Sequence, residues 1–77
     1  MTGGRPEKHS LTLRGHRTSV SLEAPFWEAF RDIAKAEGKA IGALASEIDA
    51  DRGMDMGLAS AIRVYVLAWH RREAGLG

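Results

Sequence analysis

The stretch GHRTSVSLE, Gly15–Glu23, decides the fold expected for this chain. Polar and apolar residues alternate from Arg17 to Leu22, which is the pattern of a half-buried β-strand. One side of the strand carries Arg17, Ser19 and Ser21, and the other side carries Thr18, Val20 and Leu22. An isolated strand leaves a row of N–H and C=O groups unpaired and is not stable in water. The fold therefore depends on what this strand pairs with.

The residues just before this strand could pair with it. Leu11 and Leu13 also alternate with polar residues, but they are out of phase with Val20 if the strand runs straight through. A two-residue turn at Gly15-His16 would correct the phase by forming a hairpin with Leu11 opposite Val20. A bulge at Gly15 would also correct it. The sequence leaves open whether residues 10–14 pair with 17–22 or continue a single ribbon.

Three helices are predicted after the strand region of residues 10–22, over residues 24–37, 40–50 and 58–72. Apolar residues recur in each at helical spacing. Pro25 suits the first turn of the first helix, and Gly38 suits a left-handed cap at its end. The third helix is apolar on both sides, which is typical of a buried helix. Because so short a chain can hardly cover it, we predict that this helix lies in the core of a dimer.

Size and composition favour a single domain that oligomerises. A chain of 77 residues without cysteine is marginal alone and has no disulfides to stabilise it. The polar first ten residues do not resemble a signal peptide, and residues 58–69 are too short to cross a bilayer. We therefore expect a cytoplasmic protein without a membrane partner.

Charge is distributed unevenly along the chain. Residues 1–22 contain four basic residues and one acidic residue, whereas residues 23–55 contain four basic and eight acidic residues. Residues 1–9 are predicted to be a flexible basic arm and residues 73–77 a tail. A basic strand region suits an anionic partner.

Catalytic and metal-binding motifs are not found in the sequence. The acidic segment from Asp49 to Asp55 has Met54 where a calcium loop needs its central glycine. Phe26, Trp27 and Phe30 lie at helical spacing and are expected in the core rather than as platforms for stacked bases. We expect no enzyme activity, no cofactor and no metal.

The polar side of the strand suits DNA recognition. A two-stranded ribbon fits the DNA major groove, where Arg17, Ser19 and Ser21 would meet base edges. Arg14 and His16 lie at the edge of such a surface, within reach of phosphates. The alternative is that these residues are simply the solvated side of the ribbon.

The order of elements resembles a ribbon-helix-helix DNA-binding domain, mainly helical with one short β-ribbon. The segments GHRTSVSLEAPFW and LASAIRVYVLAWHRR are similar to a small bacterial family of this type, which has a GHRTS-x-SLE-x-x-FW signature and an added C-terminal helix. The resemblance covers residues 8–72. It implies an intertwined homodimer in which the strand pairs with its copy from a second chain.

The resemblance also implies where DNA and the second chain are bound. Double-stranded DNA would meet the outward strand residues, and the start of the second helix, at Lys39, Ala40 and Ile41, would hold a phosphate. The dimer core would contain Val20, Leu22, Phe26, Trp27, Phe30, Ile33, Ile41, Leu44, Ile48, Ile62, Tyr65, Val66 and Trp69.

The leading hypothesis is a homodimeric DNA-binding transcriptional regulator. The alternative is a dimeric protein-interaction module, similar to an antitoxin, that binds a protein partner through the third helix or the acidic middle. Positive charge from Arg5, Lys8 and Arg14 beside the ribbon favours the first hypothesis, since phosphate contacts need it.

Overall fold

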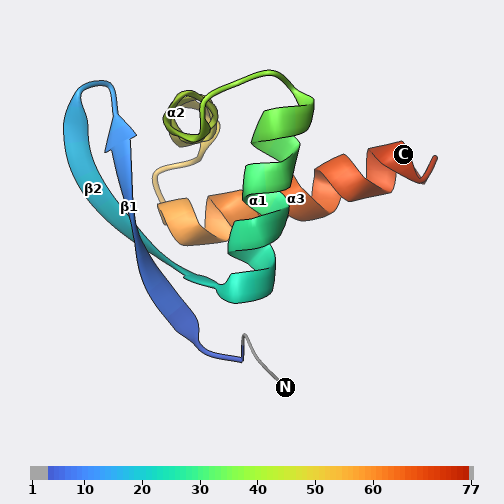
Figure 1. The fold of residues 1–77 in the computed structure, drawn as a ribbon, viewed down its shortest axis with the longest axis horizontal. Coiled ribbons are helices and arrows are strands. Elements are labelled where there is room, and N and C mark those ends of the chain that lie inside the picture. Colours follow the sequence, from blue (N-terminus) through green and yellow to red (C-terminus); the bar gives the residue numbers. More distant parts are fainter. Residues whose placement is uncertain (1–3, 77) are drawn as a thin grey trace.

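A β-hairpin followed by three helices forms the computed structural model, which describes residues 4–76 (Figure 1). The strands are β1 (Pro6–Leu13) and β2 (His16–Glu23). The helices are α1 (Ala24–Ala36), α2 (Ile41–Asp51) and α3 (Leu58–Glu73). The predicted order of a ribbon and three helices is confirmed, with helix ends within one residue of the predicted ones.

The partner of β2 is β1 of the same chain, so of the two open arrangements the structure has the hairpin. The register pairs Leu13 with His16, so the two-residue turn is Arg14-Gly15 rather than the predicted Gly15-His16. Leu11 therefore lies opposite Thr18, and the prediction that it lies opposite Val20 is wrong. Both turn residues have positive φ, 51° at Arg14 and 83° at Gly15, as a type I′ turn requires. β1 takes one of the two edges of β2 in a two-stranded sheet, so the expectation that the strand pairs with its copy in a second chain stays a prediction.

β1 begins earlier than predicted. Residues 6–9 were expected in the flexible arm, but they pair along β2 as far as Glu23. Backbone pairing over eight residues on each strand satisfies groups that an arm would leave to water. The start of the predicted arm, residues 1–3, lies outside the described residues.

Glycine positions fix how the helices end and how closely they approach the ribbon. Gly38 follows α1 with φ 69°, which confirms the predicted left-handed cap. Lys39 N–H donates to Ala34 C=O at 2.9 Å, so the cap is a Schellman motif. Gly42, in the first turn of α2, lies against β1. A Cβ at Gly42 would be 2.7 Å from the carbonyl oxygen of Thr12, so only glycine allows this approach.

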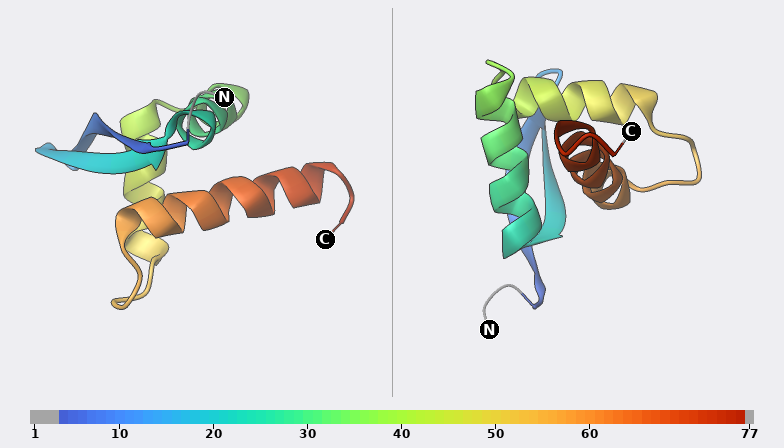
Figure 2. Two further views of the ribbon diagram at one scale, coloured as in Figure 1. Left: turned by 90° about the horizontal axis from the view of Figure 1, so that it is seen from below. Right: turned by 90° about the vertical axis from the view of Figure 1, so that its right-hand side faces the viewer.

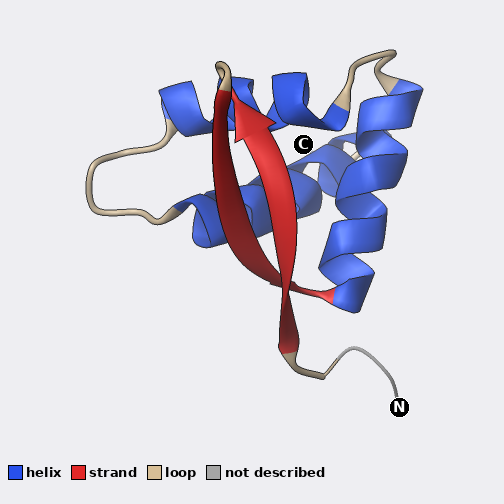
Figure 3. Ribbon diagram, turned by 60° about the vertical axis from the view of Figure 1, so that its left-hand side comes forward, coloured by secondary structure: helices blue, strands red, loops and turns tan. Residues whose placement is uncertain are grey.

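The ribbon lies across the three helices, with one face turned toward them and the other away (Figure 3). The inner face contributes Leu11, Val20 and Leu22 to a core closed within one chain. Of the residues predicted for a dimer core, eight are buried in this core: Val20, Leu22, Phe30, Ile33, Leu44, Ile48, Ile62 and Val66. Five are partly buried against it: Phe26, Trp27, Ile41, Tyr65 and Trp69.

One side of α3 is covered by its own chain and the other is not. Ala61, Ile62 and Val66 are buried, whereas Val64 and Leu67 remain 56% and 60% exposed. Figure 2 shows α1 and the ribbon on one side of α3, with α2 crossing α3 near its N-terminal end. Within residues 4–76, no helix has the length and apolar character needed to span a bilayer.

Candidate nucleic-acid interface

Six polar side chains share the outer face of the hairpin. Cross-strand partners point to the same side of a sheet, and the register pairs Lys8 with Ser21, Ser10 with Ser19 and Thr12 with Arg17. All six are exposed, while the alternate residues Leu11, Val20 and Leu22 are buried. We call this set the outer face: Lys8, Ser10, Thr12, Arg17, Ser19 and Ser21.

The outer face has the dimensions and chemistry to meet a DNA groove. Two strands about 4.8 Å apart fit a major groove about 12 Å wide. Lys8 and Arg17 contribute positive charge, and the four hydroxyl groups donate and accept hydrogen bonds. The helices lie behind the other face, so they leave this surface open (Figure 3).

Glu23 lies on the same side of the ribbon as the outer face, but its carboxylate forms an ion pair with Arg63 of α3. Arg63 donates from Nε and Nη2 to the two carboxylate oxygens of Glu23, at 2.9 and 3.0 Å. The hydrogen bond from its own backbone and the one from Arg63 lower the pKa of the Glu23 carboxyl. Arg63 also stacks over Phe26, with its guanidinium carbon 5.8 Å from the ring centroid. The pair therefore fixes α3 to the end of the ribbon.

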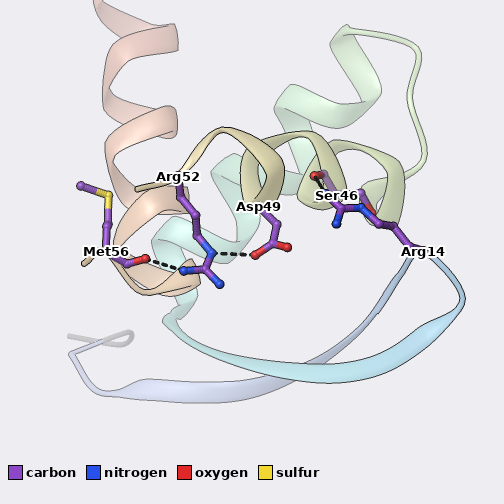
Figure 4. Close-up of polar contacts among 5 residues, drawn as sticks. All are labelled: Arg14, Ser46, Asp49, Arg52 and Met56. Carbon is purple, nitrogen blue, oxygen red and sulfur yellow. Dashed lines mark hydrogen bonds and ion pairs between the residues drawn. The ribbon is translucent and has the colours of Figure 1, made fainter. Parts of the chain in front are cut away.

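The two predicted phosphate contacts at the turn lie in different surroundings. Arg14 folds back onto α2, where its Nη2 lies 3.4 Å from the carbonyl oxygen of Ser46 (Figure 4). His16 pairs with Leu13 and so belongs to the side of the ribbon opposite Arg17. Both residues are exposed at the tip of the hairpin, outside the outer face.

The start of α2 lies beside the ribbon, as the close contact between Gly42 and Thr12 requires. Ala40 occupies the N-cap position, and no side chain caps the first N–H groups of the helix. Lys39 forms an ion pair with Glu47 at 2.8 Å, and this hydrogen bond raises the pKa of the Lys39 amine. Its charge is therefore partly compensated within the chain.

Trp27 is not free to stack on a base. The ring of His9 lies parallel to it, with centroids 4.1 Å apart and planes 6° apart. This stack joins β1 to α1 under the inner face of the ribbon. The expectation that Trp27 belongs with the core agrees with this contact.

The acidic segment weighed as a calcium loop is organised by an arginine. Arg52 donates from Nε to Asp49 at 2.6 Å and from Nη1 to the Met56 carbonyl at 2.8 Å (Figure 4). The Asp49 carboxylate is therefore already paired with the Arg52 guanidinium of the same chain. Across residues 4–76, His, Cys, Asp and Glu side chains form no cluster of three that would hold a metal ion.

Sequence reasoning missed half of the outer face. Ser10 and Thr12 were not among the predicted base contacts, and Lys8 was assigned to phosphate from a flexible arm. The turn could have identified these three residues, because a type I′ turn at Arg14-Gly15 fixes the register of β1 against β2.

A solvated polar face on a two-stranded ribbon, backed by helices, defines a class of small ribbon-and-helix domains. Residues 6–70 match the family model described as a ribbon-helix-helix domain, which is most of the chain. The chain belongs to the ribbon-helix-helix domain family. Domains of this family are generally DNA-binding and non-enzymatic. No curated protein and no solved structure matched the chain.

Proposed function

We propose that this protein is a homodimeric DNA-binding transcriptional regulator of bacterial type, acting in the cytoplasm, that places the outer face of its ribbon in the major groove. The observation that carries the proposal is the outer face itself: six exposed polar residues, two of them cationic, on a ribbon whose other face is buried. Family membership supports DNA as the partner.

The residues of the outer face divide into two kinds of contact. Arg17 is suited to a bidentate contact with guanine O6 and N7, and the neighbouring Ser19 and Ser21 hydroxyls reach adjacent bases. Lys8, at the other end of the face, is suited to phosphate. The start of α2, flanking Thr12, and Arg14 at the turn would add phosphate contacts along the groove edge.

Titration of labelled genomic fragments at two salt concentrations tests the proposal. A specific regulator selects some fragments over others, and its affinity falls steeply as salt rises because phosphate contacts release counterions. Equal and weak binding to every fragment at low salt would contradict it.

The exposed side of α3 favours a second candidate, a protein-interaction module. Val64 and Leu67 present an apolar surface that DNA would not cover. Capture of a different protein by this side, with no DNA selectivity, would make that candidate the better one.

A further inference from the structure

α2 and α3 form an open groove at the end of α2 that leads into the connecting loop. One wall is a single side of α3, where residues at i, i+3, i+4 and i+7 spacing line the groove. Two of these residues, Ala61 and Ala68, have short side chains that leave room between the helices. The volume of about 320 Å³ lies at the lower end of the range for small-molecule sites. We call this space the α2–α3 groove, and its apolar and aromatic lining is Ile48, Met56, Ala61, Val64, Tyr65 and Ala68.

Three charged residues also line the groove, and two of them are neutralised within the chain. Glu47 forms an ion pair with Lys39 at 2.8 Å. Arg52 forms an ion pair with Asp49 at 2.6 Å, and its guanidinium is turned toward that carboxylate (Figure 4). The third is Asp51, the last residue of α2, which is exposed and makes no ion pair in the described part of the chain. The groove therefore presents one carboxylate whose charge is not matched.

An apolar lining with one unmatched carboxylate restricts the chemistry of a ligand. Asp51 would repel an anion, and a neutral apolar molecule would leave its charge without a partner. A polyamine carries more positive charge than one carboxylate balances. Tyr65 adds an aromatic ring, and such rings attract cations as well as apolar groups. The class that matches all of these features is an apolar molecule with a single ammonium group.

We propose that the α2–α3 groove binds a small organic amine with one positive charge, its ammonium group at Asp51 and its apolar body along Val64 and Tyr65. None of the six outer-face residues lines the groove, so this site and the DNA interface are separate. Amine binding would therefore occur whether or not the ribbon binds DNA.

Titration of the full chain with phenethylamine at neutral pH, followed in amide proton–nitrogen NMR spectra, tests this site. We expect saturable binding, with the largest shifts at the end of α2 and along α3. Two probes with nearly the same apolar body are the matched controls: phenethyl alcohol, which is neutral, and hydrocinnamate, which is anionic. Each should bind at least about tenfold more weakly than the amine, because neither brings a cation to the Asp51 carboxylate.

Variants separate the charge of the site from its shape. Asp51→Asn should weaken phenethylamine binding at least about fivefold and bring it close to that of phenethyl alcohol. Asp32→Asn, which removes an equally exposed carboxylate from α1, is the matched control and should change nothing. Ala68→Trp should abolish binding of the amine and the alcohol alike, because the larger side chain fills the groove. Ala68 is exposed, so circular dichroism should show that this variant remains folded.

Three results would overturn the site: equal affinity for the amine, the alcohol and the carboxylate, an Asp51→Asn variant that binds the amine as well as the wild type does, or shifts that map outside the groove. Sedimentation of the same samples shows whether another protein surface covers the groove instead. A self-associated chain that takes up no amine would also overturn the site.

Discussion

Gly42 shows how a single missing side chain sets the distance between a helix and the ribbon. Its Cα faces the Thr12 carbonyl so closely that an added methyl group would lie 2.7 Å away. Elsewhere in a helix, glycine is less favourable than alanine by about 0.5–1 kcal/mol. The close contact at this position reverses that preference.

Gly42→Ala should therefore lower the melting temperature, although alanine is the better helix former. Ala43→Gly, at an exposed position inside the same helix, is the matched control, because alanine is there expected to be the more stable residue. Thermal melts followed by circular dichroism give the comparison. A Gly42→Ala variant more stable than the wild type would mean that α2 does not rest on β1.

The ion pair of Glu23 and Arg63 makes stability depend on pH in a defined direction. The folded state lowers the pKa of the Glu23 carboxyl, so folding favours its charged form. The stabilisation is present above the carboxyl's ordinary pKa and is lost as pH falls through the lowered folded value.

The melting temperatures of the wild type and Arg63→Gln should differ at neutral pH and converge in acid. Chemical denaturation at several pH values between neutral and strongly acidic gives the same comparison as free energies of unfolding. A difference in stability between the wild type and Arg63→Gln that grows as pH falls would contradict the role given to this ion pair.

At the scale of the elements, the two faces of β2 have opposite tolerance for charge. Leu22 is fully buried on the inner face, whereas Ser21 is exposed on the outer face. A carboxylate at position 22 would be buried without a partner. The free-energy cost of burying it is comparable to the whole free energy of unfolding of a small domain.

Leu22→Asp should therefore abolish cooperative unfolding, while Ser21→Asp should melt like the wild type and lose DNA affinity through charge repulsion. Thermal melts and DNA titration of both variants test the assignment of faces. A folded Leu22→Asp variant together with an unfolded Ser21→Asp variant would mean that the faces are inverted.

The helices could be predicted from the sequence because their signals are local. Apolar spacing, Pro25 and Gly38 each act within one or two turns, and they placed α1 within one residue. The turn was predicted one residue too late because it requires positive φ at Arg14, a conformation that arginine rarely adopts. This error shifts each cross-strand pair by two residues. Pairing along all of β1 is a non-local property, which alternation in residues 10–14 did not reveal.

The outer face could be predicted only for the strand that alternates clearly. Arg17, Ser19 and Ser21 follow from the period of β2, whereas Ser10 and Thr12 join them only through the register. Lys39 looked like a free phosphate ligand because its partner Glu47 is eight residues away on the next helix.

At the scale of the whole molecule, the helices cover the inner side of the ribbon and leave its outer face open to a partner (Figure 3). The ribbon lies beside the N-terminal end of α3, and the C-terminus of α3 points away from it (Figure 1).

The central claim is that the outer face of the ribbon recognises DNA sequence, and Arg17→Ala tests it most directly. The measurement is the affinity of wild type and variant for a selected fragment and for unrelated fragments at the same salt concentration, with Arg31→Ala as the matched control on α1. We expect Arg17→Ala to lose about 1–3 kcal/mol of binding free energy for the selected fragment per lost base contact, with the fold intact and the preference over other fragments reduced. If Arg17→Ala binds every fragment as well as the wild type does, the ribbon is not the recognition element.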